Sequence, residues 1–277
     1  MARTRDRSRE HDVIVFGASG FTGELVAEYL LAHYGDSDLR IALAGRNEAK
    51  LEAVRERLGV VHPKADSLPI LMADSFDKKA LKRLAKSAEV ICTTVGPYAK
   101  YGEPLVEACV DRGTDYCDLT GETPFIRRII DRYHDAARES GARIVCCCGF
   151  DSIPSDLGTL MVQEAMHERY GAYANEVRYI AGRMGGALSG GTVASMLNIV
   201  DQAKRDRDLR SILLDPYALN PPGDREGPDG RDQSGVRYDD DLQSWTGPFM
   251  MAAINTRVVR RTHALMGHPW GLSLIHI

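Results

Sequence analysis

The sequence predicts an α/β fold in which a doubly wound parallel sheet is followed by a second, smaller α+β domain. From residue 12 to about residue 150, short apolar runs alternate with amphipathic segments of helical period. Most of the apolar runs are continuous rather than alternating, which is typical of parallel strands that are covered on both faces. Because connections between such strands cross over in a right-handed sense, this regular alternation predicts a doubly wound sheet.

Strands and helices alternate along this first part of the chain. The expected strands lie at residues 12–16, 39–44, 68–72, 89–94, 115–118 and 143–147. Each expected helix carries apolar residues three and four positions apart, which is typical of a helix with one buried face. These helices lie at residues 21–34, 48–58, 78–86, 104–111 and 124–140. The faces expected to be buried are Leu25, Val26, Tyr29 and Leu30 in the first helix, and Ala80, Leu81, Leu84 and Ala85 in the third.

The pattern changes after Gly149, and residues 151–277 are expected to form the smaller domain. We expect helices at residues 155–167 and 192–204, and strands at residues 176–181 and 251–259. A flexible segment before the second of these helices is predicted by Gly185, Gly186, Gly190 and Gly191. Residues 215–248 are rich in Pro, Gly and Asp, and predict a long loop or a partly disordered stretch.

Composition limits the classes of function. The chain has 277 residues, 44% hydrophobic and 27% charged, which is ordinary for a globular protein of one large or two modest domains. A net charge of -4 argues against nucleic-acid binding, because proteins with that function are usually basic. No apolar run reaches the roughly eighteen residues of a transmembrane helix, so no transmembrane segment is expected.

The N-terminus and the cysteines predict a location in the cytoplasm. Residues 1–11 alternate arginine with serine and acidic residues and lack the apolar core of a secretory signal, so we expect a solvated, disordered tail. No CxxC pair occurs, and we expect reduced core residues, with a reactive thiol as the alternative. Peripheral membrane association through a longer native chain stays open. The six cysteines are Cys92, Cys109, Cys117, Cys146, Cys147 and Cys148.

Three glycines stand where the first strand passes into the first helix, in the stretch VIVFGASGFTG of residues 13–23. The first N–H groups of a helix have no partner inside it and the helix dipole is positive there, so a pyrophosphate can bind if no side chain blocks it. Gly17 allows a tight turn, Gly20 lets backbone approach phosphate, and Gly23 lets the helix lie close on the strand. This context predicts dinucleotide binding, with a purely structural turn as the alternative.

The end of the second strand indicates which dinucleotide is bound. An NAD-preferring domain usually has Asp or Glu there, on the ribose hydroxyls. This chain has Ala44-Gly45-Arg46-Asn47 and no acid. Arg46 can pair with a 2′-phosphate, which an acidic side chain would repel. The sequence therefore favours NADP over NAD, and the alternative for Arg46 is a surface position at the start of the next helix.

Two further loops follow strands at the edge where an open α/β sheet binds its ligands. In the first, TTVGPY, Gly96 and Pro97 make a short, rigid loop that is suited to pass beneath a nicotinamide ribose. In the second, CGFDSIP, Asp151 is a candidate for ligand contact. Ser152 and Ser155 are candidates to cap the helix that follows, and capping is also the alternative role for Asp151.

Other enzyme classes lack their motifs. The chain has no Y-x-x-x-K, no G-x-S-x-G and no GxxxxGK[ST], and its eight histidines show no metal-ligand spacing, so no metal site is expected. Hydride transfer remains, in which the cofactor carries the reaction while the protein orients it and supplies one proton donor. The candidate donors are Tyr98, Lys100 and Tyr101, each with a surface or packing position as the alternative. Asp151 is a further catalytic candidate.

Four stretches in combination indicate a family. They are GASGFTG, AGR, TTVGPYAKYGEPLVEACVDRGTDYCDLTGE and GFDSIPSDLG. Together they resemble the saccharopine dehydrogenase-like oxidoreductases and, within them, most resemble the actinobacterial trans-acting enoyl reductases. The likeness runs from about residue 12 to about residue 265, and includes WTGPF and NTRVVRRTHAL near the end.

The resemblance implies a Rossmann-type NAD(P)-binding domain at residues 12–150 and a substrate domain at residues 151–277. For the enoyl reductases it implies reduction of a polyketide-derived double bond in lipid assembly. The segment Thr120-Gly121-Glu122 matches a family signature without an assigned role, and no catalytic residue is transferred. The residues that match the cofactor region are Gly17, Ser19, Gly20, Phe21, Thr22 and Arg46, and those that match the loop facing the nicotinamide are Thr94, Gly96 and Pro97.

The resemblance also implies an amino acid as an alternative class of substrate. Saccharopine dehydrogenases bind an amino dicarboxylic acid, which needs clustered cationic side chains in the second domain. The available arginines, whose spacing does not demand such a pocket, are Arg178, Arg183, Arg257, Arg260 and Arg261. Family members usually continue beyond this length, and the final GLSLIHI departs from the family pattern, so we expect the second domain to be incomplete at its C-terminus.

Three functions therefore stay open. The first is an NADPH-dependent reductase of an unsaturated acyl, lipid or polyketide substrate. The second is a saccharopine-type dehydrogenase that acts on an adduct of an amino acid and a keto acid. The third is a scaffold that binds the nucleotide without turnover. None of them involves nucleic acid or a membrane span within this chain.

Overall fold

The computed structural model describes residues 8–182, 190–270 and 273–276, and the chain divides into two compact units. Unit 1 comprises Met1–Thr120 and Ile129–Cys146. Unit 2 comprises Gly121–Arg128 and Cys147–Ile277. The division therefore falls close to the expected boundary after residue 150, and assigns one short segment, Gly121–Arg128, to the second unit.

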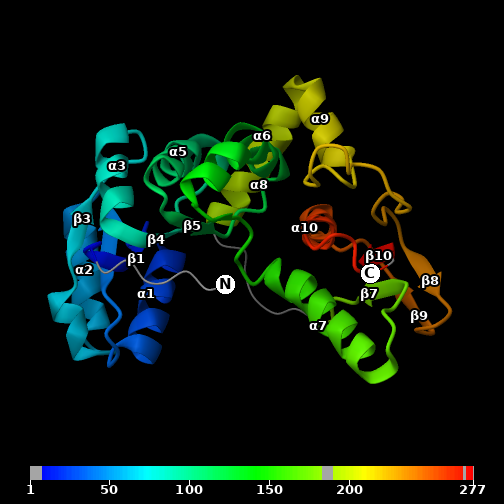
Figure 1. Cartoon of the computed structure of the whole chain (residues 1–277), viewed down its shortest axis with the longest axis horizontal. Coiled ribbons are helices and arrows are strands. Elements are labelled where there is room, and N and C mark those ends of the chain that lie inside the picture. Colours follow the sequence, from blue (N-terminus) through cyan, green and yellow to red (C-terminus); the bar gives the residue numbers. More distant parts are fainter. Residues whose placement is uncertain (1–7, 183–189, 271–272, 277) are drawn as a thin grey trace. The chain divides into compact units, whose positions relative to one another are not determined.

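Unit 1 is built on a parallel sheet whose strands, within the described residues, follow the order β3-β2-β1-β4-β5-β6 (Figure 1). Every neighbouring pair is parallel. Because β2 and β3 lie on one side of β1 and the later strands on the other, the order reverses at β1, and the predicted doubly wound sheet is confirmed. The strands are β1 (His11–Phe16), β2 (Ile41–Gly45), β3 (Ile70–Met72), β4 (Ala88–Thr93), β5 (Asp115–Asp118) and β6 (Ile144–Val145).

The crossover helices follow from the strand order. Right-handed connections place α1 and α2 on one face of the sheet and α3 and α5 on the other. The predicted bounds of the first two helices are confirmed. A short helix, α4, was not predicted. The helices are α1 (Phe21–Tyr34), α2 (Glu48–Leu58), η1 (Pro63–Ser67), α3 (Lys78–Ser87), α4 (Tyr98–Tyr101), α5 (Glu103–Arg112) and α6 (Thr123–Ser140), of which α6 continues from one unit into the other.

The buried face of α1 matches the predicted one in part, because Val26 and Leu30 pack against the core cluster. Leu25 and Tyr29 are exposed, whereas Gly23, Ala27 and Leu31 are buried. These three residues are four positions apart, and the two small ones let the helix approach the sheet closely. Side-chain size at the contact, rather than hydrophobicity alone, therefore selects the buried face. The stripe predicted for α3 is confirmed, because all four of its residues are buried.

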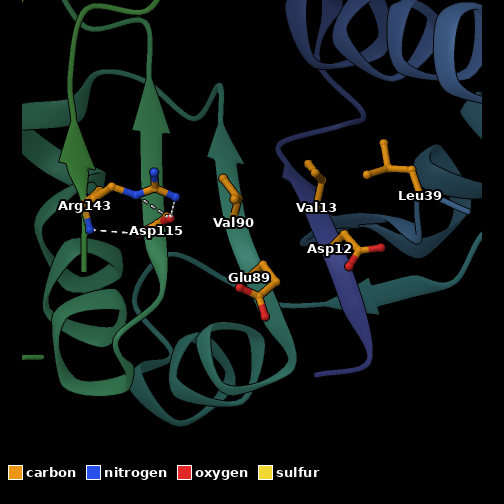
Figure 2. Close-up of a pocket in the computed structure, with 7 residues that line it drawn as sticks. All are labelled: Asp12, Val13, Leu39, Glu89, Val90, Asp115 and Arg143. Atoms are coloured by element: carbon orange, nitrogen blue, oxygen red, sulfur yellow. Dashed lines mark hydrogen bonds and ion pairs between the residues drawn. The ribbon is translucent and has the colours of Figure 1, made fainter. Parts of the chain in front are cut away.

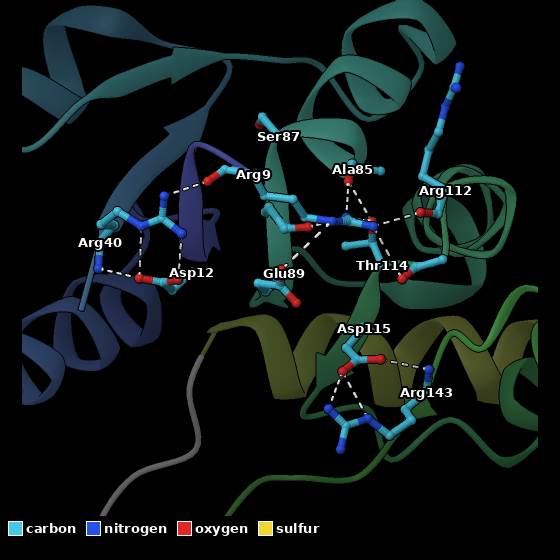
Figure 3. A network of polar contacts seen from close by, with 12 residues as sticks. Arg9, Asp12, Arg40, Ala85, Ser87, Glu89, Arg112, Thr114, Asp115 and Arg143 are labelled. Atoms are coloured by element: carbon cyan, nitrogen blue, oxygen red, sulfur yellow. Dashed lines mark hydrogen bonds and ion pairs between the residues drawn. The ribbon is translucent and has the colours of Figure 1, made fainter. Parts of the chain in front are cut away.

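The N-terminal residues belong to the sheet unit (Figure 3). The guanidinium of Arg9 donates to the carbonyls of Ala85 at 3.0 Å and Arg112 at 2.8 Å, and to the hydroxyl of Thr114 at 2.5 Å. These acceptors lie at the ends of α3 and α5 and at the start of β5. His11 begins β1 and is buried. Residues 9–11, which the sequence assigned to a solvated tail, therefore close the N-terminal edge of the sheet.

Two buried carboxylates hold neighbouring strands together at the same edge (Figure 3). Asp12 accepts hydrogen bonds from the backbone N–H, Nε and Nη2 of Arg40 at 2.8, 3.1 and 2.8 Å. Asp115 accepts from the backbone N–H and Nε of Arg143, both at 2.8 Å. Each pair joins one strand to the entry of the next, because a carboxylate at the start of one strand holds the residue just before its neighbour.

Unit 2 contains helices and two small sheets. The parallel sheet pairs β7 with β10, and the antiparallel one pairs β8 with β9. Gly190 and Gly191 begin α8, so the flexible segment predicted there is wrong at these two residues, while Gly185 and Gly186 lie outside the described residues. The elements are α7 (Ile153–Tyr170), β7 (Glu176–Tyr179), α8 (Gly190–Arg205), α9 (Arg207–Leu214), β8 (Arg237–Asp239), β9 (Ser244–Thr246), α10 (Ala252–Leu265) and β10 (Ser273–His276).

The strand predicted at residues 251–259 is wrong, because this segment begins α10. Its buried positions recur at helical spacing but carry polar as well as apolar side chains, among them Asn255, Thr256 and Arg257. Hydrophobic periodicity alone could not show this face, since polar residues are buried only where partners satisfy them. Those partners come from distant parts of unit 2.

Arginines of α10 hold the long segment that precedes the β8–β9 hairpin. Arg257 pairs with Asp232 and donates to the carbonyl of Asp215 at 3.2 Å. Arg260 pairs with Asp229 at 2.8 Å, and both side chains are 3% exposed. The long loop expected here is present at residues 215–236, where it is anchored by charge-assisted hydrogen bonds from a helix, and the β8–β9 hairpin takes up part of the remaining stretch.

The six cysteines, all within the described residues, are thiols rather than disulfides. The prediction of core positions is confirmed for Cys109 and Cys147, which are buried. It is wrong for Cys148, which is exposed a short way beyond β6, and the remaining three are half-buried.

We expect Arg260→Met to destabilise unit 2 strongly. Removing one partner of a buried ion pair leaves Asp229 charged and uncompensated, at a cost of about 3–5 kcal/mol. Urea unfolding followed by circular dichroism should show a lower midpoint for the single variant. The double variant Arg260→Met with Asp229→Leu should recover most of the loss. An unchanged midpoint in the single variant would contradict the anchoring role of α10.

Candidate functional site

The three glycines form a turn at the carboxyl end of β1. The N–H groups of Gly17 and Ala18 donate to the carbonyl of Ala44 at 2.8 and 3.3 Å, which ties the turn to the end of β2. The N–H of Gly20 donates back to the carbonyl of Gly17 at 2.9 Å. The turn is thus closed by backbone bonds alone, and α1 begins at Phe21.

Each glycine is required for a separate reason. Gly17 has a φ of +91°, which side chains other than glycine rarely adopt. A Cβ on Gly23 would lie 2.2 Å from the carbonyl oxygen of Gly17 and 2.8 Å from the Cα of Ala18, so the helix packs directly on the turn. A Cβ on Gly20 would lie 3.3 Å from the same oxygen and would stand over the open end of the helix.

The N-terminal end of α1 is bare. Gly20 occupies the N-cap position, and no side chain caps the helix there. The first N–H groups of a helix have no intrahelical acceptor, and their partial positive charge is left facing outward. An oxyanion is the natural partner for such an end.

The loop after β4 is held beside this turn. The N–H of Thr94 donates to the carbonyl of Phe16 at 3.0 Å, and its hydroxyl donates to that of Gly17 at 3.3 Å. Val95 packs on Gly17, since its Cγ2 lies 2.7 Å from where a Cβ there would be. The structure therefore brings Thr94 to the glycine turn, and the loop continues through Gly96 and the cis peptide to Pro97.

Several polar side chains around the turn are available for a ligand. In residues 8–182, 190–270 and 273–276, the hydroxyls of Ser19 and Thr22 and the guanidinium of Arg46 have no hydrogen-bond or ion-pair partner. Arg46 is exposed directly after β2, and Asn47 next to it caps α2 by accepting from the N–H of Lys50 at 3.0 Å. Arg46 therefore does lie at the surface near the start of α2, as the alternative expected. Its positive charge has no partner there among the described residues and is available for a ligand.

The candidate proton donors are not equivalent. Tyr98 is buried, and its hydroxyl donates to the carbonyl of Thr93 at 3.1 Å, so this proton is engaged in holding the loop. Tyr101 packs edge-on against Phe76, with ring centroids 5.5 Å apart. Lys100 is exposed on α4. Of these three residues, Lys100 is the one that is exposed, whereas Tyr98 is buried and Tyr101 is half-buried.

Asp151 and the serines that follow it lie in unit 2, in a polar cluster that the sequence did not predict. Asn255 of α10 donates to the carbonyl of Asp151 at 2.7 Å and to the hydroxyl of Ser155 at 3.0 Å, and accepts from the hydroxyl of Ser152 at 2.9 Å. The predicted side-chain cap by Ser152 is wrong, since it makes no cap hydrogen bond. Burial raises the pKa of the Asp151 carboxyl.

Glu122, the last residue of the signature Thr120-Gly121-Glu122, has a structural role in unit 2. Glu122 is buried and accepts from the hydroxyl of Ser195 in α8 at 2.9 Å. Its carbonyl accepts from the N–H of Phe125 at 2.9 Å as α6 begins. Glu122 thus joins the start of α6 to α8.

A pocket of about 220 Å³ lies at the opposite, N-terminal edge of the sheet (Figure 2). Its carboxylates Asp12 and Asp115 are paired with arginines, so it presents no free charge comparable to that of Arg46. Ligands of open parallel sheets bind at the other edge. The lining residues are Asp12, Val13, Leu39, Glu89, Val90, Asp115 and Arg143.

Two kinds of feature are absent from the described ranges. No three His, Cys, Asp or Glu side chains there are grouped as metal ligands. No helix among the same residues has the length and hydropathy needed to cross a bilayer.

Known sequences match both parts of the chain. Residues 13–145 match the family described as "Saccharopine dehydrogenase NADP binding domain". A Mycobacterium tuberculosis protein whose name assigns it provisionally to the trans-acting enoyl reductases is 45% identical over 269 residues. The trans-acting enoyl reductases of Mycobacterium bovis and Mycobacterium leprae are 42% and 40% identical over 270 residues. Each match covers 95% of this chain, which spans 63% of the length of these relatives.

Solved structures with a similar arrangement are distant in sequence. Apo saccharopine dehydrogenase from Saccharomyces cerevisiae aligns with a TM-score of 0.43 and 19% identity, over 57% of this chain and 32% of that one. An NAD binding oxidoreductase from Klebsiella pneumoniae aligns with a TM-score of 0.40 and 20% identity, over 62% and 42%.

The sequence matches confirm the resemblance inferred from the four motifs. They cover the glycine turn, the end of β2 and the loop after β4. Residues 13–145 are thus similar to the saccharopine dehydrogenase NADP-binding domains, and along 95% of its length the chain is similar to trans-acting enoyl reductases.

Proposed function

We propose that the chain is an NADPH-dependent reductase of a carbon–carbon double bond in an unsaturated acyl substrate derived from a lipid or polyketide. The observation that carries this proposal is the bare end of α1 at the carboxyl edge of the sheet, beside an unpaired Arg46. The names of the relatives add the reaction class, because they are called trans-acting enoyl reductases.

The residues of the turn fit a diphosphate. Gly20 leaves no Cβ over the helix end, so backbone N–H groups can reach phosphate oxygens directly. The hydroxyls of Ser19 and Thr22 flank this end and can donate to the same oxygens. The exposed ring of Phe21, 76% accessible at the first helical position, can cover the bound group.

Arg46 selects NADP over NAD in this proposal. A 2′-phosphate next to the end of β2 would meet a guanidinium that has no competing carboxylate partner in the described residues. The nearest acid of α1, Glu24, is paired with Arg57 at 2.7 Å, and this pairing lowers the pKa of Glu24. The positive charge of Arg46 is therefore not neutralised from that side.

The loop after β4 positions the reactive end of the cofactor. Bound NADPH supplies the hydride that one carbon of the double bond accepts. Thr94 is hydrogen-bonded to Gly17 and so fixes the position of the loop. Gly96 and Pro97 offer a surface with little side-chain bulk, on which no large group would obstruct the nicotinamide ribose. Tyr98 stabilises the loop through Thr93 and is not the proton donor in this account. Lys100 and Asp151 stay candidates for the donor.

The saccharopine-type alternative is weakened by the arginines it would need. Arg257 and Arg260 pair with carboxylates, and Arg261 donates to the carbonyl of Leu219 at 2.6 Å. Arg178 pairs with Glu176 at 2.6 Å and with Asp241, while Arg183 lies outside the described residues. The engaged arginines stabilise the fold of unit 2, which argues against their use on a dicarboxylate substrate.

We expect Gly20→Ala and Gly23→Ala to separate cofactor binding from folding. Gly23→Ala should lower the melting temperature, because its Cβ collides with the turn. Gly20→Ala should melt near the wild type but bind NADPH about tenfold more weakly, ~1.4 kcal/mol, because its Cβ stands over the phosphate site. Calorimetric titration and thermal melting measure both.

The matched control is Gly158→Ala, at a helical glycine of α7 with nothing within 4 Å of its Cβ. It should leave the NADPH affinity unchanged and raise the melting temperature slightly, because alanine is the better helix former by about 1 kcal/mol. Equal NADPH affinity in Gly20→Ala and the wild type would argue that no phosphate sits on the helix end.

We expect Arg46→Glu to reverse the cofactor preference. A charge-assisted hydrogen bond contributes about 1.5–3 kcal/mol, so NADPH affinity should fall roughly 10- to 100-fold while NADH affinity stays the same or rises. Quenching of intrinsic fluorescence by each nucleotide gives the ratio. Lys86→Glu, the same charge change at the end of α3, is the control. If both variants shift the ratio equally, Arg46 does not read the 2′-phosphate.

We expect oxidation of NADPH when an α,β-unsaturated acyl thioester is added, because the hydride has no other acceptor. Absorbance of the reduced nicotinamide reports the rate, and mass spectrometry should find the saturated acyl product. Tight NADPH binding without turnover on a panel of enoyl thioesters would instead favour the nucleotide-binding scaffold. Oxidation of saccharopine with NADP would favour the amino-acid dehydrogenase.

A further inference from the structure

One half of one sheet face in unit 1 is only partly covered. The strand registers align Val15, Cys92, Cys117 and Val145 across β1, β4, β5 and β6, so all four side chains point to the same face. Val15 is fully buried in the cluster formed by α1 and α2. Exposure then increases along the row, through the half-buried cysteines to Val145 at 49%.

Two thiols occupy the middle of this row. Cys92 and Cys117 are register partners on adjacent parallel strands, which lie about 4.8 Å apart. Their side chains are within hydrogen-bonding reach, and the bond to Cys92, followed by burial, raises the pKa of the Cys117 thiol. Both thiols are therefore paired with each other, rather than lying singly among apolar residues.

The other cysteines are placed differently. Cys109 is fully buried in α5, and burial raises the pKa of its thiol. Cys146 is one residue beyond Val145, so its side chain alternates to the other face. Cys147 is buried and Cys148 is exposed. Both lie beyond the end of β6, so neither is aligned with a residue on a neighbouring strand.

We propose that Cys92 and Cys117 form a two-thiol binding site for a soft, thiophilic group that takes two sulfur ligands at once, of which a trivalent arsenical is the representative. With phenylarsine oxide, two As–S bonds form and the As–O bond breaks. The two thiol hydrogens and the oxide oxygen leave as one water, so no oxidant or reductant is required. The rigid sheet holds both sulfurs in place, which favours a chelate over two single attachments.

The test uses the reduced chain and phenylarsine oxide as the probe. Intact-mass spectrometry should show one phenylarsenic group that survives a wash with excess glutathione and is removed by dimercaptopropanol. The variant with Cys146, Cys147 and Cys148 all changed to Ser should retain this group. Cys92→Ser and Cys117→Ser should each lose it, and Cys109→Ser should keep it. Retention in Cys117→Ser at the wild-type level would overturn the proposal.

A cross-linking measurement on the wild-type chain keeps the test independent of any folding defect in the serine variants. Dibromobimane joins two nearby thiols as two bromides leave. Trypsin places Cys92 in residues 87–100 and Cys117 in residues 113–127, apart from Cys109 and from residues 144–169. The expected product is a bimane bridge between the first two peptides. A bridge found only within residues 144–169 would overturn the proposal.

Discussion

The close contact between α1 and the turn before it governs the architecture of unit 1 and of its candidate site. Gly23 lies against the carbonyl of Gly17, with no room for a Cβ, and this carbonyl also accepts from Gly20 and Thr94. One backbone oxygen thus fixes the start of the helix, the end of β1 and the loop after β4. Because the helix start, the strand end and the loop are held by backbone groups or short side chains, no large side chain of these contacts covers the surface above them.

This arrangement explains why the polar groups gather at one edge of the sheet. The N-terminal edge is closed by ion pairs, in which Asp12 and Asp115 hold Arg40 and Arg143 and Arg9 joins three segments (Figure 3). At the carboxyl edge, the hydroxyls of Ser19 and Thr22 and the guanidinium of Arg46 have no such partners in the described residues. Charge is therefore used for stability at one end, and is available for a ligand at the other.

The sequence predicted unit 1 well because its signals are local. The strand bounds of β5 and the helix bounds of α1 and α2 follow from runs and caps that involve only nearby residues. The buried face of α1 was predicted in part: Val26 and Leu30 pack against the core, but close packing selected small residues over the more hydrophobic Leu25 and Tyr29. The glycine turn was predictable residue by residue, because each glycine meets a steric demand that no other residue satisfies.

Unit 2 was harder to predict because its stability comes from polar contacts between distant segments. α10 buries Asn255 and Arg260, whose partners lie dozens of residues away, and no hydrophobic pattern shows such a face. The segment around Tyr217 and Asp229 looked like a loop by composition, yet the arginines of α10 anchor it. The use of these arginines in folding, which spacing could not reveal, is also what weakens the amino-acid substrate hypothesis.

The central claim is that the uncapped end of α1 receives the diphosphate of a pyridine dinucleotide. A crystal structure of the chain grown with NADPH tests it most directly. We expect diphosphate oxygens within hydrogen-bonding distance of the first backbone N–H groups of α1, with the 2′-phosphate on Arg46. Cofactor density at the N-terminal edge of the sheet, or a diphosphate held away from α1, would contradict it.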